Sequence, residues 1–401
     1  MEKIKTLTVM GTRPEAIKMV PVIQELRRHR LTETVVVSTA QHRQMLDQVL
    51  SLFGLVPDVD LNIMQPRQSL NDIVCRAVEG LDRVCREHSP DAVLVQGDTT
   101  TAFAASLAAF NRKIPVGHVE AGLRSGQLWD PYPEEGNRRL ISAIASMHFA
   151  PTKKSADNLW RENIAHSAVY VTGNTGIDCL LRVVEARAGH LTRFLPEGFS
   201  VNGRRMILVT AHRRENWAGP LEHLCNAIRE LAFECPDIWF LYPVHLNPAV
   251  REAVMPRLSG LHNVALTEPL PYGAFIEAMA ASHLILTDSG GVQEEAPSLG
   301  KPVLVLRETT ERPEGIASGA AMLVGMEKNK ILQATRRLLS DDLAYQQMVG
   351  YRNPYGDGQA ARRTVEALLH WLGLGSRPQM FVEALPFHLE IEGTNAMATA
   401  G

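Results

Sequence analysis

The sequence contains few cysteines and no long apolar run. Its five cysteines are widely spread and never form a Cys-x-x-Cys pair: Cys75, Cys85, Cys179, Cys225 and Cys235. An odd, scattered set argues against a disulfide framework or a zinc site and favours free thiols in a reducing compartment. No stretch approaches the roughly 20 apolar residues that a membrane helix needs, and the first apolar run, Ile4–Met10, is too short for a signal-peptide core. These absences predict a cytoplasmic protein.

The chain also lacks a strong charge of either sign. Lysine and arginine together number 41 and aspartate and glutamate 44, which leaves a formal net charge of -3 in 401 residues. No global field therefore draws the protein toward nucleic acid or an anionic membrane surface, and neither is expected as a partner. Any anionic ligand has to be met by positive groups placed locally.

Two common nucleotide-binding motifs are missing as well. Neither Gly-x-Gly-x-x-Gly nor a Walker sequence occurs, which argues against a bound dinucleotide and against P-loop kinase chemistry. Asp58-Val59-Asp60 has the form of the metal-binding Asp-x-Asp of some glycosyltransferases, but it falls in a linker between a helix and an extended segment. The sequence therefore predicts no metal site and no cofactor.

Short apolar runs rich in β-branched residues alternate with longer helical patterns. This alternation is typical of βαβ units and parallel sheets. The expected strands include Thr6–Met10, Thr34–Ser38, Ala92–Gln96, Pro115–Val119, Met206–Thr210, Trp239–Val244, Leu284–Thr287 and Pro302–Leu306. Because these runs are apolar on both faces, we expect helices on both sides of each sheet. The chain is also longer than one hydrophobic core usually supports, so two domains are expected.

The two halves of the chain echo each other. A strand leads into an Arg-bearing turn and a helix at Gly11–Glu15 and again at His212–Glu215. A second strand of each half ends on a turn with aspartate and glycine, at Gly97-Asp98 and at Asp288–Gly291. Two Rossmann-like, doubly wound α/β domains with a ligand cleft between them explain this repetition better than one long sheet. The predicted ranges are 1–173, 174–375 and a disordered tail at 376–401.

A phosphate-binding turn is expected in the second half. The residues Asp288–Gly291 lead from a strand into a helix, so backbone N–H groups and the helix N-terminus meet an anion that two glycines let approach closely. Glu295, about one turn further on, is a candidate for ribose hydroxyls, and Arg312 and His212 are candidate ligand contacts. A tight turn with Ser289 as a capping residue explains the same sequence equally well.

Charged residues gather at the predicted strand ends of the first half. Arg13 and Lys18 follow the first strand, Asp98 and Glu120 follow two later strands, and Glu134 lies in a Pro-rich loop. Because the carboxyl ends of parallel strands share one edge, Asp98 and Glu120 are expected in one crevice. A structural role is the simpler interpretation of any single carboxylate, but the three together indicate an acid/base cluster whose pKa values are split.

Several motifs recur in a fixed order. They are Gly11–Glu15, Gln41–Asp47, Gln96–Thr101, His118–Arg124, Pro133–Glu135 with Asn137-Arg138, His212–Asn216 and Thr287–Gly300. Together they resemble the bacterial non-hydrolysing UDP-N-acetylglucosamine 2-epimerase family over about residues 5–374. Each motif alone is weak, but the ordered set is specific. The resemblance implies two Rossmann-like domains of the GT-B type, isomerase activity and a homodimer.

The resemblance also implies roles for individual residues. Asp98, Glu120 and Glu134 match acid/base carboxylates, and His212 matches a group that interacts with the leaving diphosphate. The implied nucleotide contacts are Arg13, Lys18, Ser289, Gly290, Gly291, Glu295 and Arg312, with Leu270 and Phe275 against uracil. Some family members bind a second UDP-N-acetylglucosamine as an activator, and the matching residues are Gln41, Gln44, Arg67 and His245. We therefore predict allosteric regulation by the substrate.

The implied reaction is reversible inversion at C2 of UDP-N-acetylglucosamine, giving UDP-N-acetylmannosamine for surface polysaccharide synthesis. The C2 hydrogen is not next to a carbonyl carbon, so deprotonation alone would give an unstabilised carbanion, and no nicotinamide motif is present to oxidise C3. Elimination of UDP to 2-acetamidoglucal, followed by re-addition, is the remaining route. In that route carboxylates exchange the C2 proton while His212 and arginines stabilise the departing diphosphate.

Three other functions use similar residues. A hydrolysing epimerase would release free N-acetylmannosamine, but the absence of a fused sugar-kinase domain and the intact activator set favour the non-hydrolysing form. A GT-B glycosyltransferase would need an acceptor pocket, about which the sequence says nothing. A non-catalytic nucleotide-sugar sensor has no use for three clustered carboxylates, because like charges oppose binding of an anion.

Overall fold

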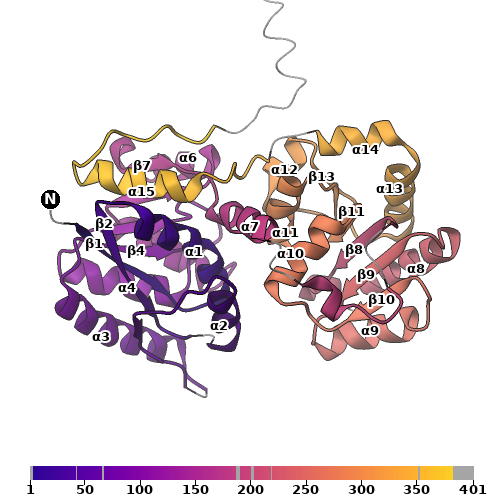
Figure 1. Cartoon of the computed structure of the whole chain (residues 1–401), viewed down its shortest axis with the longest axis horizontal. Helices are drawn as coiled ribbons and strands as arrows, with labels where there is room; N and C mark the ends of the chain where they lie inside the picture. Colours follow the sequence, from indigo (N-terminus) through magenta and orange to yellow (C-terminus); the bar gives the residue numbers. More distant parts are fainter. Residues whose placement is uncertain are drawn as a thin grey trace, which may run out of the picture. The chain divides into compact units, whose positions relative to one another are not determined.

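The chain folds into two compact units. The computed structural model describes residues 3–41, 43–65, 67–186, 190–199, 203–217, 219–350 and 353–382, without the side chains of residues 43–45. The first unit comprises Met1–Cys179 together with Tyr355–Glu383, and the second contains Leu180–Pro354. Figure 1 shows that each unit is an α/β domain with one central sheet.

The first unit is built on a seven-stranded sheet in the order β3-β2-β1-β4-β5-β6-β7, with parallel pairing throughout. Its strands are β1 (Ile4–Met10), β2 (Thr32–Ser38), β3 (Val59–Asp60), β4 (Ala92–Gln96), β5 (Val116–Val119), β6 (Met147–Ala150) and β7 (Val169–Val171). The strand order reverses between β1 and β4. The loops that follow these two strands therefore diverge, which is where ligands bind in open α/β sheets.

The second unit repeats this plan with six parallel strands in the order β10-β9-β8-β11-β12-β13. They are β8 (Met206–Thr210), β9 (Trp239–Pro243), β10 (Val264–Thr267), β11 (Leu284–Thr287), β12 (Val303–Val305) and β13 (Ala321–Leu323). Here the order reverses between β8 and β11. The predicted pair of doubly wound Rossmann-like domains is confirmed.

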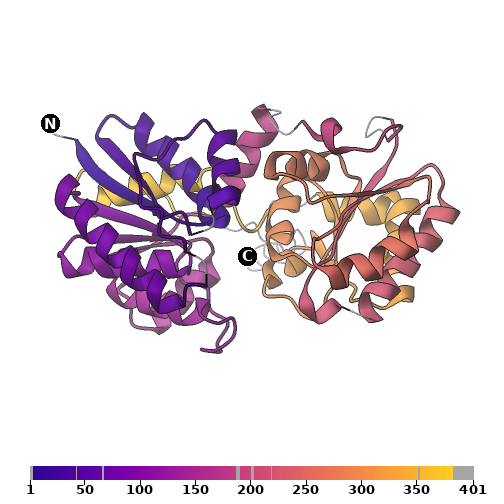
Figure 2. The ribbon, with the colours of Figure 1, turned by 90° about the horizontal axis from the view of Figure 1, so that it is seen from below.

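Helices cover both faces of each sheet (Figures 1 and 2). They are α1 (Arg13–Arg28), α2 (Arg43–Leu52), α3 (Leu70–His88), α4 (Thr100–Asn111), α5 (Glu134–Ile144), α6 (Lys153–Arg161), α7 (Thr175–Ala186), α8 (Gly219–Glu234), α9 (Pro248–Leu258), α10 (Tyr272–Ala281), α11 (Gly290–Glu295), α12 (Pro313–Ala317), α13 (Lys328–Ser340), α14 (Asp342–Val349) and α15 (Ala360–Trp371). Short 3-10 segments are η1 (His166–Ala168), η2 (Leu191–Phe194), η3 (Arg214–Asn216) and η4 (Ala296–Leu299).

Alternate strand residues make the core of the first unit. Leu7 and Val9 of β1 lie in one apolar cluster with Ala77 of α3, Ala105 of α4 and Ile141 of α5. Because successive strand residues point to opposite faces, the residues between them serve the other face. The eight expected strands are confirmed within one or two residues at their ends. The five that were not predicted, β3, β6, β7, β10 and β13, have only two to four residues each.

The predicted range 174–375 for the second domain is wrong at both ends. The first unit continues to Cys179, within α7, and includes the chain again from Tyr355 onward. The returning helix α15 packs against α1, and Figure 1 shows it in yellow beside the indigo helices. The buried carboxylate of Asp178 accepts the backbone N–H groups of Ala360 at 3.2 Å and Ala361 at 2.8 Å, so it caps α15. A bond between residues so far apart in the sequence leaves no local signal.

The predicted disordered tail also begins too early. Arg377 donates to the carbonyl oxygens of His166 at 3.2 Å and Val169 at 2.5 Å. The backbone N–H of Phe381 donates to the carbonyl of Val171 at 2.8 Å, so the segment pairs with the edge of β7. The rest of the predicted tail, residues 383–401, lies outside the described residues.

Phe381 anchors this segment and gives a test of the revised boundary. Its side chain is 7% exposed and joins an apolar cluster of the first unit, whereas the next residue, Val382, is 78% exposed. We expect Phe381→Ala to lower the free energy of unfolding of the first unit by about 3 kcal/mol, as for other buried phenylalanines. Val382→Ala is the matched control and should cost almost nothing. Urea denaturation measures both, and equal effects would show that residues 376–382 do not stabilise the first unit.

Candidate active site

The turn after β1 is organised by the buried carboxylate of Glu15. Its Oε2 accepts the backbone N–H groups of Gly11 at 3.0 Å and Thr12 at 2.8 Å, and its Oε1 accepts the hydroxyl of Thr99 at 2.7 Å. Burial raises the pKa of Glu15, and these hydrogen bonds oppose the rise. Gly11 has to be glycine, because a Cβ would lie 2.2 Å from Oγ1 of Thr39. Glu15 thereby ties the turn after β1 to the turn after β4.

Glu120 follows β5 and turns back toward two neighbouring elements. Its φ angle of 64° is in the left-handed region, which residues with side chains rarely adopt. Lys18 of α1 forms an ion pair with one carboxylate oxygen, and Gln96 at the end of β4 donates to the other. The side chains of Lys18 and Glu120 are only 20% and 10% exposed, so solvent screens the pair weakly. Two residues that were predicted for the site are therefore in direct contact.

Asp98 lies two residues after β4 and is contacted by α5. Nε of Arg138 lies 2.9 Å from its Oδ2, and the side-chain amide of Asn137 donates to its carbonyl oxygen at 2.9 Å. Burial raises the pKa of Asp98; the positive charges of Arg138 and Lys18 oppose the rise, and the negative charge of Glu134 adds to it. The three predicted carboxylates therefore stand at one edge of the first sheet, as expected.

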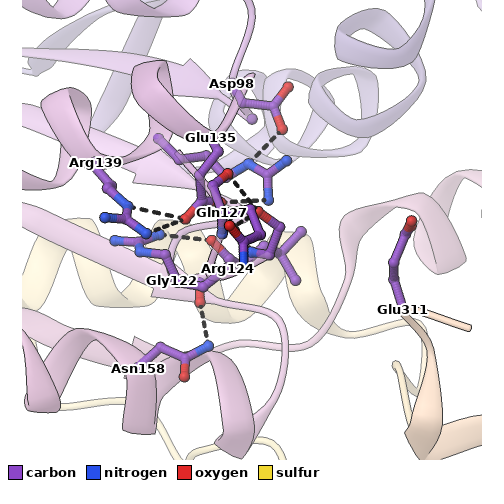
Figure 3. A network of polar contacts seen from close by, with 12 residues as sticks. Asp98, Gly122, Arg124, Gln127, Glu135, Arg139, Asn158 and Glu311 are labelled. Carbon is purple, nitrogen blue, oxygen red and sulfur yellow. Dashed lines mark hydrogen bonds and ion pairs between the residues drawn. The ribbon is translucent and has the colours of Figure 1, made fainter. Parts of the chain in front are cut away.

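A second layer of charged groups supports this edge (Figure 3). Glu135 is fully buried and accepts the backbone N–H of Ser125 at 3.0 Å and the guanidinium of Arg139 at 3.0 and 2.9 Å. Arg124 pairs with both carboxylate oxygens of Glu162, at 2.7 and 2.6 Å. These pairs connect the loop after β5 to α5 and α6. None of the four charged residues was predicted for the site.

Two buried histidines lie beside one another on β5 and β6. His118 and His148 are register partners and are 0% and 1% exposed. Nε2 of His118 lies 2.7 Å from the carbonyl oxygen of Gly97, so this nitrogen carries the proton and donates. Burial lowers the pKa of His118 to about 3 and that of His148 to about 4, and both rings are neutral at pH 7. His118 thereby fixes the turn that presents Asp98.

In the second unit, the buried Asp288 joins the ends of β8 and β11. Its Oδ2 accepts the backbone N–H groups of His212 at 2.8 Å and Arg213 at 2.9 Å and the amide of Asn216 at 2.9 Å. Nδ1 of His212 lies 3.3 Å from the other oxygen. Burial raises the pKa of Asp288, but the hydrogen bonds and charge of His212 and the other donors outweigh it, and the net pKa is lowered. The carboxylate of Asp288 thus lies beside Nδ1 of the His212 ring.

Two arginines converge on the first residue of α11. A Cβ placed on Gly290 would lie 3.7 Å from Cζ of Arg312 and 3.9 Å from a terminal nitrogen of Arg213. Arg312 also forms an ion pair with Glu294, and the carboxylate of Glu311 lies 3.8 Å from each of the two guanidinium groups. Two positive charges at the start of a helix make this turn suited to an anion. Arg213 was not predicted as a site residue.

The other predicted nucleotide contacts are in the same unit, except Arg13. Ser289 precedes α11, but its hydroxyl makes no capping hydrogen bond, which counts against the capping-serine interpretation. Glu295 ends α11 and is half-buried, Leu270 is 8% exposed, and Phe275 of α10 is partly exposed. Arg13 begins α1 in the first unit and is partly exposed.

The predicted activator residues are divided between the two units. Gln41 accepts the hydroxyl of Thr101 at 2.9 Å, and Arg67 is exposed with φ 59°. His245, in the second unit, stacks on His212, a predicted catalytic residue, with ring centroids 5.5 Å apart. The side chain of Gln44 lies outside the described residues. The activator role stays a prediction.

The sequence-based search missed the buried ions that organise the site. Glu15, Glu135, Arg138 and Asp288 all lie inside motifs that were recognised, so the motif itself was the available signal. Their partners are up to 84 residues away in the chain, as for Glu15 and Thr99, and the sequence does not reveal such pairs.

Within the described part of the chain, no group of three or more histidine, cysteine, aspartate or glutamate side chains is placed to hold a metal ion. None of the helices there combines the length and apolarity needed to cross a membrane.

Comparison with known proteins identifies the family. A family model described as UDP-N-acetylglucosamine 2-epimerase matches residues 24–369, most of the chain. The UDP-N-acetylglucosamine 2-epimerase of Escherichia coli K12 is 53% identical over 371 residues, which cover 91% of this chain and 98% of the relative. The chain belongs to the UDP-N-acetylglucosamine 2-epimerase family. The Bacillus subtilis epimerase is 52% identical over 373 residues, covering 93% of this chain and 97% of that protein.

Solved structures share the fold of this chain. The Neisseria meningitidis epimerase bound to UDP-N-acetylglucosamine superposes with a TM-score of 0.82 at 51% identity, covering 92% of this chain and 100% of that chain. An S. aureus protein in complex with UDP gives a TM-score of 0.81 at 44% identity, covering 94% and 100%. The predicted family, the GT-B type of fold and the assignment as an epimerase are thereby confirmed.

The buried histidines predict how acid affects the first unit of this epimerase. In the unfolded chain a histidine has a pKa of about 6.5, so the unfolded state takes up protons first as the pH falls. His118 and His148 should therefore cost stability progressively from about pH 6.5 down to their low native pKa values, by up to about 1.4 kcal/mol per pH unit each.

His148→Gln isolates the histidine contribution. Urea unfolding of both proteins between about pH 7 and about pH 5 should show a shallower acid loss for the variant. The comparison is needed because the raised pKa values of Glu15 and Asp98 act in the opposite direction. Parallel curves for the two proteins would rule out a neutral, buried His148.

Proposed function

We propose that this epimerase inverts C2 of UDP-N-acetylglucosamine by losing and regaining UDP. The observation that carries the proposal is the cluster of Asp98, Glu120 and Glu134 at one sheet edge, in which burial raises the pKa of Asp98. A carboxylate whose pKa is raised takes up and releases a proton more readily near neutral pH than an ordinary carboxylate does. The relatives bound to UDP-N-acetylglucosamine and to UDP support the choice of substrate.

The chemistry of the sugar explains why elimination is proposed. The C2–H bond is not acidified by a neighbouring carbonyl carbon, so its electrons need somewhere to go. In the proposed step the C2 proton passes to a carboxylate, the C–H electrons form the C1=C2 double bond of 2-acetamidoglucal, and the C1–O bond breaks with its electrons leaving on UDP. Re-addition of UDP at C1 with proton delivery to the opposite face of C2 gives UDP-N-acetylmannosamine. No atom is gained or lost in the overall reaction.

The second unit supplies groups suited to the departing diphosphate. Negative charge grows on the β-phosphate as the C1–O bond breaks. Fixed positive charge therefore stabilises the transition state more than the intact nucleotide sugar. Arg213 and Arg312 at Gly290 provide such charge, and His212 is held at Nδ1 by Asp288, which leaves Nε2 for the ligand. We assign Ser289, Gly291 and Glu295 to the nucleotide as well.

The remaining assignments follow the family resemblance. Arg13 and Lys18 are proposed to meet the nucleotide sugar from the first unit, and Leu270 and Phe275 are proposed to contact uracil. The product is proposed to feed surface polysaccharide synthesis, and a homodimer and substrate activation remain predictions of the same kind.

The product mixture separates this proposal from its alternatives. Purified protein with UDP-N-acetylglucosamine alone should form UDP-N-acetylmannosamine until a constant ratio is reached, as measured by proton NMR. Free N-acetylmannosamine with stoichiometric UDP would instead indicate a hydrolysing epimerase. Turnover that occurs only after an acceptor is added would indicate a glycosyltransferase. Tight binding of the nucleotide sugar without any turnover would indicate a sensor.

Single carboxylate substitutions test the acid/base cluster. Asp98→Asn, Glu120→Gln and Glu134→Gln should each lower kcat about 100-fold or more, as for other lost proton-transfer groups. Asp130→Asn is the matched control, because Asp130 is an exposed carboxylate of the loop that precedes Glu134. Initial rates of epimer formation measure all four variants. Wild-type kcat in the three cluster variants would contradict the assignment.

A further inference from the structure

Helix α5 contacts Asp98 at both its backbone and its side chain. The amide of Asn137 donates to the carbonyl oxygen of Asp98 at 2.9 Å, and Nε of Arg138 lies 2.9 Å from the carboxylate. The first residue of the same helix, Glu134, is close enough for its charge to raise the pKa of Asp98. Helix α5 thus contributes both to the position of Asp98 and to the charges around it.

Glu135 also lies near the guanidinium of Arg138, at ion-pair distance. NH1 of Arg138 lies 3.6 Å from Oε2 of Glu135, and that oxygen also accepts the backbone N–H of Ser125 at 3.0 Å. The side chain of Arg138 is 12% exposed and that of Glu135 is fully buried. The positive guanidinium therefore lies between two carboxylates, and its charge is attracted to both. The charge of Glu135 therefore favours the position from which Arg138 pairs with Asp98.

Arg139 provides a built-in contrast. It binds the same Glu135 more closely than Arg138 does, at 3.0 and 2.9 Å, and its side chain is 42% exposed. Among the described residues, no hydrogen bond or ion pair joins Arg139 to Asp98. Figure 3 shows Arg139 beside Glu135, with Asp98 apart from both. The two adjacent arginines both form ion pairs with Glu135, but only Arg138 also contacts the carboxylate of Asp98.

We propose that Arg138, which lies between Glu135 and Asp98, is a positioning residue that fixes the carboxylate of Asp98 and keeps a positive charge beside it. The inference rests on the proposed function, because it takes Asp98 as one of the groups that exchange the C2 hydrogen. It assigns the second glutamate of Pro133-Glu134-Glu135 a supporting role that differs from the acid/base role of the first.

Arg138 is the strongest of the groups that oppose the effect of burial on the pKa of Asp98. Burial and the charge of Glu134 on α5 raise the pKa of Asp98, while Arg138 on α5 and Lys18 on α1 lower it, with Arg138 the stronger. Lys18 is already paired with Glu120, which follows β5. Loss of Arg138 should therefore leave Asp98 with a higher pKa and a less defined orientation.

The direction of the expected change does not depend on which role Asp98 has. If Asp98 must be ionised to accept the proton, the acidic limb of the pH profile of kcat/KM reports its pKa. If it must be protonated to donate, the basic limb reports it. In both cases a higher pKa moves that limb to higher pH.

The experiment compares pH profiles of kcat/KM for the wild type, Arg138→Gln and Arg139→Gln. Arg138→Gln should move one limb upward by about one pH unit, a typical effect of a lost neighbouring charge, and lower kcat about tenfold at pH 7 with little change in KM. Arg139→Gln should leave the profile in place. Equal shifts in both variants, or no shift in Arg138→Gln, would overturn the inference.

Two further variants protect the test. In the Asp98→Asn background, Arg138→Gln should no longer move the residual profile, because the group that it acts on is gone. Arg138→Lys keeps the positive charge but lacks the second guanidinium nitrogen that lies near Glu135. The shifted limb of the pH profile should therefore return toward the wild-type pH while kcat stays reduced. If Arg138→Gln does not fold, wild-type kcat in Arg138→Lys overturns the inference. Wild-type protein that forms no epimer would contradict the proposed function instead, before any variant is compared.

Discussion

Buried negative charge is the constraint on which this structure depends. An ionised carboxylate removed from water is costly unless donors or cations surround it. Glu15 and Asp288 meet this requirement with backbone N–H groups at strand ends, so each joins two loops of its sheet. Glu135 meets it with Arg139 and a backbone N–H. Asp98 meets it with the charges of Arg138 and Lys18, yet burial still raises its pKa.

The two units share a topology but place groups of opposite charge at the carboxyl edges of their sheets. In each sheet the strand order reverses near the middle, between β1 and β4 in one and between β8 and β11 in the other. The loops that follow these strands lie at the carboxyl edge of the sheet. In the first unit that edge gathers Asp98, Glu120 and Glu134, with Lys18 paired to Glu120 and Arg138 beside Asp98. In the second it gathers Arg213 and Arg312 near a pair of glycines. Our proposal therefore assigns acid/base chemistry to the first unit and stabilisation of the departing anion to the second.

Much of this arrangement could be predicted from sequence because it depends on local pattern. Apolar runs located all the longer strands, and strand-end positions correctly brought Asp98 near Glu120. Short edge strands such as β13 lack enough residues to show a pattern. The return of α15 to the first unit depends on Asp178, which caps a helix more than 180 residues away. Likewise, the charge partners that set the protonation of Asp98 come from α1 and α5, and only the folded chain brings them together.

Transfer of the C2 hydrogen through these carboxylates is the central claim. The most direct measurement is proton NMR of UDP-N-acetylglucosamine turned over by the purified protein in deuterium oxide. The account predicts that the UDP-N-acetylmannosamine formed carries deuterium at C2 and hydrogen at every other carbon-bound position. Epimer that retains its original C2 hydrogen would contradict the account, because no side chain that exchanges with solvent could then have carried the proton.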